Sequence, residues 1–271
     1  MAADERIETV GGALRGVMAD PEWLKKSAIG AAVTMIPYVG AFWVIGYALH
    51  YQRALAWGQG DRLPEWKDAQ SQLRTGLFVF VVAMVYSLPL SVLLTALIVV
   101  AFAGGVFVTA ASDQAGWAIG VAVVSLIVYM LVSVLYSIVI WPVYTHVQLY
   151  DSIPAGFEFR RIFGLVKRHS TTFWTAARRS VLLNLISMTL ALVVGGGSAG
   201  LAFALISGAM SSDAAPILGV LLMPVQLVLM GVMGLVSVPI TFALNRLWAG
   251  YARVAYGLGA PAVAAPAEAA S

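Results

Sequence analysis

Charged residues are scarce in this chain, and their scarcity excludes a water-soluble globular protein. Asp, Glu, Lys and Arg together make up 11% of the 271 residues, whereas hydrophobic residues make up 61%. A soluble domain has about 25% charged residues, so this chain lacks the polar surface that contact with water requires. A disordered chain is excluded as well, because disorder needs low hydrophobicity and high charge. The composition therefore predicts an integral membrane protein.

Cysteine is absent, which excludes disulfides, thiolate metal sites and cysteine nucleophiles. The three histidines, His50, His146 and His169, are far apart in the sequence and have no pair of carboxylates nearby, so we predict no metal site. The sequence has no Ser-His-acid combination, phosphate-binding loop or dinucleotide fingerprint, so we expect no catalytic residue and no cofactor. The basic segments contain no nucleic-acid-binding module, and nucleic acid is not expected as a partner.

Long stretches without charge predict the membrane-spanning helices. About 20 mostly apolar residues are needed for a helix to cross a bilayer core. Continuous apolar runs also lack the alternation that is typical of barrel strands. Four stretches meet these conditions: 76–103, 117–150, 181–208 and 217–244. The expected fold is therefore all-α, a polytopic helical membrane protein with four spans.

One further apolar stretch, residues 27–51, is long enough to cross but contains Pro37 in its middle. Proline removes a helical hydrogen bond and disfavours helix in the preceding residue. The stretch is therefore either a kinked fifth span or a re-entrant hairpin of two half-helices. Residues 27–255 would form a single membrane domain. We expect an amphipathic, cytoplasmic segment over residues 1–26 and a disordered tail over residues 256–271.

The placement of Lys and Arg predicts which loops face the cytoplasm. Loops 104–116 and 209–216 contain neither residue, whereas segment 151–180 contains six of them and segment 52–75 contains four. By the positive-inside rule, the basic segments are cytoplasmic. The first 26 residues also carry four basic side chains. Both ends of the stretch around Pro37 are thus expected on one side, which favours the re-entrant alternative.

Residues 156–169 are predicted to form a helix that lies in the membrane interface. Apolar side chains recur at helical spacing on one face: Phe159, Ile162, Phe163 and Val166. Basic side chains lie mostly off that face, where they would contact anionic lipid headgroups: Arg160, Arg161, Lys167 and Arg168. The alternative is a cytoplasmic helix that packs on the bundle.

Polar side chains recur every fourth residue in two of the predicted spans. They are Ser87, Ser91 and Thr95 in the first, and Ser125, Tyr129, Ser133 and Ser137 in the second. Such side chains commonly hydrogen-bond between membrane helices. Helix packing is therefore the favoured interpretation, and the lining of a ligand path is the alternative.

A ridge of small residues predicts a close contact between helices. Its members, also four positions apart, are Gly196, Gly200, Ala204 and Gly208. Small residues let two helix backbones approach closely. The contact lies either inside one protomer, which is favoured, or between the protomers of a homo-oligomer.

Residues 20–80 carry an ordered set of motifs that resembles the start of a prokaryotic membrane-protein family, domain of unknown function 4013. The motifs are acid-Pro-acid-Trp-Leu-Lys from Asp20 to Lys25, Ile-Pro-x-x-Gly from Ile36 to Gly40, Gly46-Tyr47, Gly-x-Gly-acid from Gly58 to Asp61, Leu63-Pro64-Glu65-Trp66, and Gly76. Residues 156–174 are similar to a second block of that family. The resemblance implies a multi-helix membrane architecture and no established activity, substrate or catalytic residue.

Two functions from different classes fit these patterns. The favoured hypothesis is a non-enzymatic scaffold or accessory subunit in a prokaryotic inner membrane, because packing motifs are many and reactive groups are few. Its partners would be anionic lipids and other membrane proteins or further copies of the chain. The alternative is a small transporter or channel for a neutral or lipid-like solute, gated near Pro37. A membrane enzyme acting at headgroup level is the least favoured hypothesis.

Overall fold

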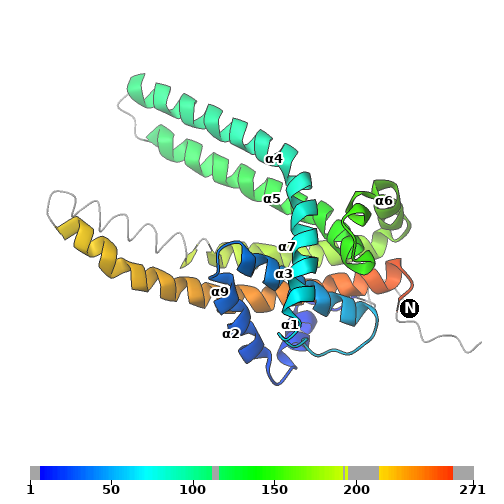
Figure 1. Ribbon diagram of the computed structural model, residues 1–271. Helices are drawn as coiled ribbons and strands as arrows, with labels where there is room; N and C mark the ends of the chain where they lie inside the picture. The colour runs from blue at the N-terminus through cyan, green and yellow to red at the C-terminus, as the bar shows by residue number, and fades with distance from the viewer. Residues whose placement is uncertain (1–6, 112–115, 192, 195–213, 259–271) are drawn as a thin grey trace, which may run out of the picture. The chain divides into compact units, whose positions relative to one another are not determined.

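The computed structural model describes residues 7–111, 116–191, 193–194 and 214–258 (Figure 1). Within these residues the chain is helical and has no strand, which confirms the all-α class. The helices are α1 (Val10–Met18), α2 (Trp23–Thr34), α3 (Val39–Ala56), α4 (Ala69–Ala111), α5 (Gly116–Tyr150), the 3-10 helix η2 (Pro154–Phe157), α6 (Phe159–Arg168), α7 (Ser170–Ala191) and α9 (Ala214–Ala255).

Three segments of the described helices are long and apolar enough to cross a membrane. They are Ala69–Val92 in α4, Ile127–Tyr150 in α5 and Pro224–Ala255 in α9. These segments overlap three of the predicted spans, 76–103, 117–150 and 217–244. The remaining predicted span, 181–208, lies largely outside the described residues and stays a prediction.

The apolar stretch 27–51 is not one continuous helix. Helix α2 ends at Thr34 and α3 begins at Val39. Between them, Tyr38 adopts a φ of 60°, a left-handed value that is costly for a residue other than glycine. The two helices pack against each other and so form a helical hairpin. A Cβ added at Gly40 would lie 1.9 Å from the Val33 carbonyl oxygen, so this turn requires glycine.

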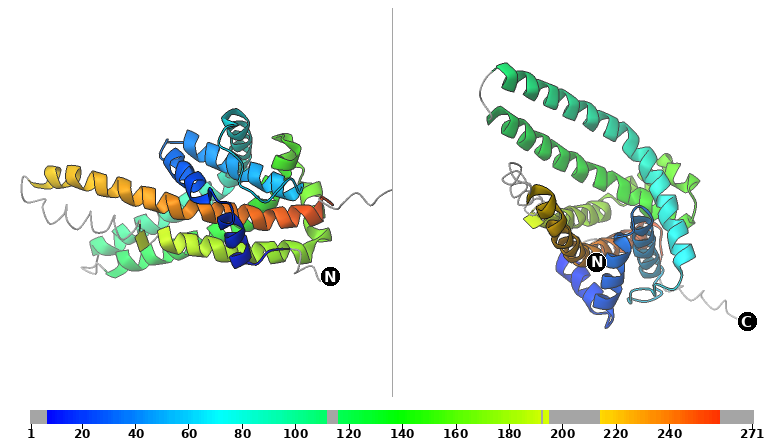
Figure 2. Two further views of the ribbon diagram at one scale, coloured as in Figure 1. Left: turned by 90° about the horizontal axis from the view of Figure 1, so that it is seen from below. Right: turned by 60° about the vertical axis from the view of Figure 1, so that its left-hand side comes forward.

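The chain divides into two compact units, and the first comprises residues 1–77 and 160–271. In its described part, α9 is the central helix and packs against α1, α2, α3 and α7 (Figures 1 and 2). The C-terminal half of α9 supplies several of the largest buried side chains, including Phe242, Trp248 and Tyr251. Aromatic side chains of α3 meet it, since the Tyr47 and Phe242 rings lie 5.2 Å apart.

The second unit comprises residues 78–159, in which the rest of α4 lies beside α5 (Figures 1 and 2). Tyrosine hydroxyls connect its elements. Tyr86 donates to the Gly156 carbonyl at 2.7 Å, and Tyr136 donates to the Ala83 carbonyl at 3.2 Å. Exposed side chains on the two helices are largely apolar, for example Leu88, Val92, Leu131 and Leu135. An apolar outer face of this kind is expected of a helix that contacts lipid.

Candidate functional site

Three serines of the predicted stripes hydrogen-bond to carbonyl groups of their own helices. Ser87 donates to the Met84 carbonyl at 3.0 Å, Ser91 to the Leu88 carbonyl at 2.9 Å, and Ser137 to the Val134 carbonyl at 2.7 Å. Thr95 and Tyr129 are exposed and Ser133 is half-buried, while the side chain of Ser125 lies outside the described part. None of these residues belongs to the described lining of the two cavities reported below.

The small-residue ridge Gly196, Gly200, Ala204 and Gly208 lies outside the described residues, so it stays a prediction.

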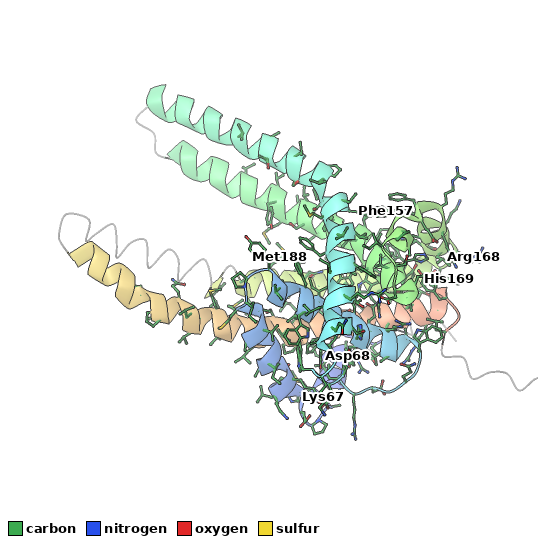
Figure 3. The ribbon with its side chains drawn as sticks, in the orientation of Figure 1. Lys67, Asp68, Phe157, Arg168, His169 and Met188 are labelled. Atoms are coloured by element: carbon green, nitrogen blue, oxygen red, sulfur yellow. The ribbon has the colours of Figure 1, made fainter. Side chains whose placement is uncertain are left out.

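Helix α6 presents its predicted basic side chains to the outside. Arg160, Arg161, Lys167 and Arg168 are all exposed, and Figure 3 labels Arg168 and His169 where α6 meets α7. The apolar face is divided: Ile162 is buried, whereas Phe159 and Phe163 are 48% and 45% exposed. Helix α6 thus packs against the protein through Ile162, and it exposes two phenylalanine and four basic side chains.

A cluster of buried polar contacts joins the start of α2 to the loop that precedes α4. We define Asp20, Lys26 and Leu63 as the polar junction. The Asp20 carboxylate accepts hydrogen bonds from the backbone N–H groups of Glu22 and Leu63, both at 2.8 Å, and from Lys26 Nζ at 3.0 Å. Lys26 Nζ also donates to the Leu63 carbonyl at 2.8 Å. Both charged side chains are thereby satisfied although they are almost fully buried.

The environment of Asp20 lowers its pKa. Burial alone would raise the pKa, because it penalises the charged form, but the hydrogen bonds from Glu22, Lys26 and Leu63 and the charge of Lys26 outweigh this effect. Asp20 is therefore ionised at neutral pH, and its charge is part of the folded structure.

Aromatic side chains extend the polar junction toward α3. The Trp66 ring stacks on Tyr47 at a centroid distance of 3.9 Å, and its Nε1 donates to the Lys26 carbonyl at 3.1 Å. The Tyr47 hydroxyl donates to the Pro64 carbonyl at 2.7 Å. The loop before α4 is therefore held by side chains from both helices of the hairpin.

Helices α3 and α4 cross with their backbones in direct contact. A Cβ added at Gly46 would lie 1.7 Å from the Gln72 carbonyl oxygen, and one added at Gly76 would lie 1.8 Å from the Phe42 carbonyl oxygen. Only glycine fits at either position. Beside this crossing, Trp43 Nε1 donates to Gln72 Oε1 at 2.8 Å, which fixes the register of the two helices.

A buried arginine in α9 fastens the N-terminal segment. Arg246 is 8% exposed. Its guanidinium forms two hydrogen bonds to the Glu8 carboxylate, at 2.7 and 3.0 Å, and donates to the Tyr51 hydroxyl at 2.8 Å. Arg179 of α7 donates to the backbone carbonyls of Ile7 and Glu8. Helices α9 and α7 thus hold the segment that precedes α1, and Tyr51 of α3 supports Arg246.

We expect Arg246→Met to lower the free energy of unfolding by about 2 kcal/mol, because it leaves the Glu8 carboxylate and the Tyr51 hydroxyl without their donor. Arg15→Met is the matched control: Arg15 is exposed and, within the part of the chain that the structure describes, donates to the carbonyl of Gly11 in its own helix, at 3.2 Å. Titration of each purified variant with SDS measures its free energy of unfolding. If the two variants are equally stable, the contacts of Arg246 do not contribute to the stability of the folded protein.

Two cavities lie in the described part of the first unit. One, of about 370 Å³, is lined by Thr175, Arg178, Arg179 and Leu182 of α7. The other, of about 360 Å³, lies along α9, where methionine and leucine side chains surround the polar groups of Thr34, Gln226 and Ser237. Sequence reasoning singled out neither Gln226 nor a cavity at Arg178. The signal available for Gln226 is a lone amide within an otherwise apolar run.

Among the residues that the structure describes, no three His, Asp or Glu side chains are grouped so that they could hold a metal ion.

A comparison with known families matches residues 29–196 to the family described as "Protein of unknown function (DUF4013)". The match covers more than half of the chain. The chain belongs to this family. No curated protein and no solved structure gives a significant match. The expected resemblance is thereby confirmed, although the opening motif from Asp20 to Lys25 precedes the matched residues.

Several of the motifs that suggested the DUF4013 family lie at or beside the polar junction. Gly46 and Gly76 form the helix crossing, Leu63 and Trp66 bond to α2, and Asp20 accepts the Leu63 N–H. The Gly-x-Gly-acid turn also has a structural cause, because Gly58 and Gly60 have φ values of 69° and 134°. In this member of the DUF4013 family, the motif residues therefore hold helices together.

Proposed function

We propose that this DUF4013 protein is a non-enzymatic scaffold or accessory subunit of an assembly in a prokaryotic inner membrane. The observation that supports this proposal most is that three charged side chains are buried within the protein. Asp20, Lys26 and Arg246 are buried and bonded to neighbouring groups of the protein itself. Chemistry on a substrate would need such groups to face a ligand, whereas a scaffold needs them to fix the shape that a partner binds.

We infer that the α2–α3 hairpin enters and leaves the membrane on its cytoplasmic side. The two ends of the hairpin touch: the Asp20 carboxylate lies 2.8 Å from the Leu63 N–H, and Trp66 bonds to the Lys26 carbonyl. Segments in such contact lie on the same side of a membrane. The turn between the helices is apolar and exposed, with Ile36 47% and Tyr38 81% exposed, as expected of a tip placed in lipid.

Helix α6 would lie at the cytoplasmic surface of this membrane. Its exposed Phe159 and Phe163 would enter the headgroup region, and Arg160, Arg161, Lys167 and Arg168 would attract anionic lipids. The ridge from Gly196 to Gly208 remains the proposed contact between helices, either within one protomer or in a homo-oligomer.

A second candidate function, a carrier for a neutral or lipid-like solute, is favoured by one observation. The cavity along α9 combines an apolar lining from Met230 and Met233 with the amide of Gln226 and the hydroxyls of Thr34 and Ser237. Its volume of about 360 Å³ lies in the range of small-molecule sites. Such a lining suits an uncharged, largely apolar molecule with a few polar groups.

Native mass spectrometry of the full chain, extracted gently with its own lipids, distinguishes the two functions. The scaffold predicts a discrete homo-oligomer or a co-purifying membrane protein. Gly200→Leu should disrupt a homo-oligomer formed through the ridge, whereas Gly120→Leu should leave it unchanged, since a Cβ added at Gly120 would meet no neighbouring group of the described residues within 4 Å. A monomer that carries one small molecule, and loses it in Gln226→Leu, would overturn the scaffold and favour the carrier.

A further inference from the structure

We propose that α7 carries a specific binding site for the phosphate headgroup of an anionic glycerophospholipid, formed by Arg178 and Arg179. The site lies on a different helix from the basic residues of α6. It rests on the membrane placement proposed above. The proposal adds that one lipid molecule binds in one defined cavity, whereas the placement of α6 involves only a general attraction between a basic surface and a charged membrane.

The lining of the cavity has the polarity that the headgroup region of such a lipid requires. Its volume is about 370 Å³, and Thr175, Arg178, Arg179 and Leu182 line it. These positions are spaced i, i+3, i+4 and i+7, so they share one face of α7. Along that face a hydroxyl is followed by two cations and then by an apolar side chain. This order matches a molecule with a negative head and an acyl chain.

The two arginines are held in place by contacts with the protein. Arg179 Nη1 donates to the carbonyls of Ile7 and Glu8. Arg178 Nε donates to the Trp174 carbonyl at 3.4 Å. Arg178 is exposed and can present the outer edge of its guanidinium to a phosphate, a geometry that arginine favours. Arg179 adds a second positive charge, already fixed in position.

The surrounding charge favours an anion. No acidic residue occurs between Glu158 and Asp213, whereas six basic residues do. The carboxylate of Glu8, on the N-terminal segment, already forms two hydrogen bonds with Arg246. A negatively charged ligand at Arg178 would therefore meet a net positive field.

The position of the cavity along α7 corresponds to headgroup depth. Arg179 is the last charged residue before Asp213, and the described residues that follow it in α7, up to Ala191, are uncharged. Trp174, one turn before Arg178, is 53% exposed, and tryptophan prefers the membrane interface. Leu182, on the side of the predicted span, is 51% exposed and would contact the acyl chain.

Titration of the delipidated full-length protein with phosphatidylglycerol, followed by native mass spectrometry, tests the site. The wild type should retain one phosphatidylglycerol molecule per chain, and it should bind phosphatidylethanolamine, which has no net charge, more weakly. Arg178→Gln should weaken binding by about tenfold, the effect expected from losing a charge-assisted hydrogen bond. Arg15→Gln on α1 is the matched control, because it removes an equal charge from an exposed position that the account assigns to no lipid contact, and it should bind as the wild type does.

Leu182→Gln keeps the net charge and changes only the acyl end of the cavity, so it should also weaken binding. The assignment is wrong if Arg178→Gln and Arg15→Gln weaken binding equally, or if neither Arg178→Gln nor Leu182→Gln weakens it. Displacement of the lipid by inorganic phosphate would identify a site for free phosphate and overturn the lipid assignment. The lipid count per chain is independent of the oligomer size, so failure of this site and failure of the scaffold are distinguishable.

Discussion

Gly46→Ala and Gly76→Ala are each expected to lower the free energy of unfolding by about 3 kcal/mol or more, the upper end of the range for overpacking. Each substitution places a Cβ within 2 Å of a backbone carbonyl oxygen on the facing helix, at Gln72 or Phe42. A flexible side chain could move aside, but a helix backbone cannot. Helices α3 and α4 would have to separate, and the Trp43–Gln72 hydrogen bond at 2.8 Å would be lost with them.

Gly164→Ala is the matched control for these two variants. Gly164 also lies in a helix, but outside its own helix backbone no described atom lies within 4 Å of the position where its Cβ would be. Alanine should stabilise that position by up to about 1 kcal/mol, because it favours helix more than glycine does. Unfolding by SDS titration compares the three proteins. If Gly46→Ala and Gly164→Ala have the same stability, the close crossing of α3 and α4 does not exist.

Lys26→Met is expected to destabilise the protein by about 3–5 kcal/mol, the usual cost of removing one partner from a buried ion pair. The Asp20 carboxylate would then remain buried without its cation, and the Leu63 carbonyl would lose a donor. The adjacent Lys25 is a matched control, because its side chain is 69% exposed and pairs with the exposed Glu22. Lys25→Met should change the stability by less than about 1 kcal/mol. Equal effects at the two lysines would contradict the polar junction.

The polar junction also predicts how stability depends on pH. The pKa of Asp20 is lower in the folded protein than its ordinary value of 3.8. The contribution of Asp20 is therefore fully present above the unfolded pKa and is lost as the pH falls through the folded pKa. The thermal unfolding temperature of the wild type should fall below about pH 4. In Asp20→Asn it should be lower at neutral pH and should fall less on acidification; an unchanged slope would show that another group governs acid unfolding.

The membrane segments could be predicted from the sequence because their signal is local. A run without charge, such as residues 76–103 or 217–244, is visible in any window of its length, and the structure has apolar helices there. The break of the stretch 27–51 was also visible, since Pro37 disfavours a continuous helix. Pro37 alone could not distinguish a kinked span from a re-entrant hairpin, because proline permits both a kink and a turn.

The polar junction and the Glu8–Arg246 ion pair could not be predicted from the sequence, because their partners are distant in the chain. Asp20 and Leu63 are 43 residues apart, and Glu8 and Arg246 are 238 residues apart. No periodicity links such positions, and a single sequence contains no covariation between them. The motif residues Gly46 and Gly76 could be recognised in the sequence. Their role, which is to let two helix backbones come into contact, follows only from the structure. Arg178 and Arg179 were counted as part of a basic segment, and the cavity beside them has no sequence signal.

The side of the membrane on which the two ends of the α2–α3 hairpin lie is the central claim of this account. The chain has no cysteine, so single cysteines can be introduced at Gly11 and Gln59, which are exposed positions on either side of the hairpin. A membrane-impermeant maleimide, applied to right-side-out and inside-out vesicles, reports the side of each. We predict that Gly11→Cys and Gln59→Cys react only from the cytoplasmic side. Reaction of the two variants from opposite sides would show that the hairpin crosses the membrane and would contradict the account.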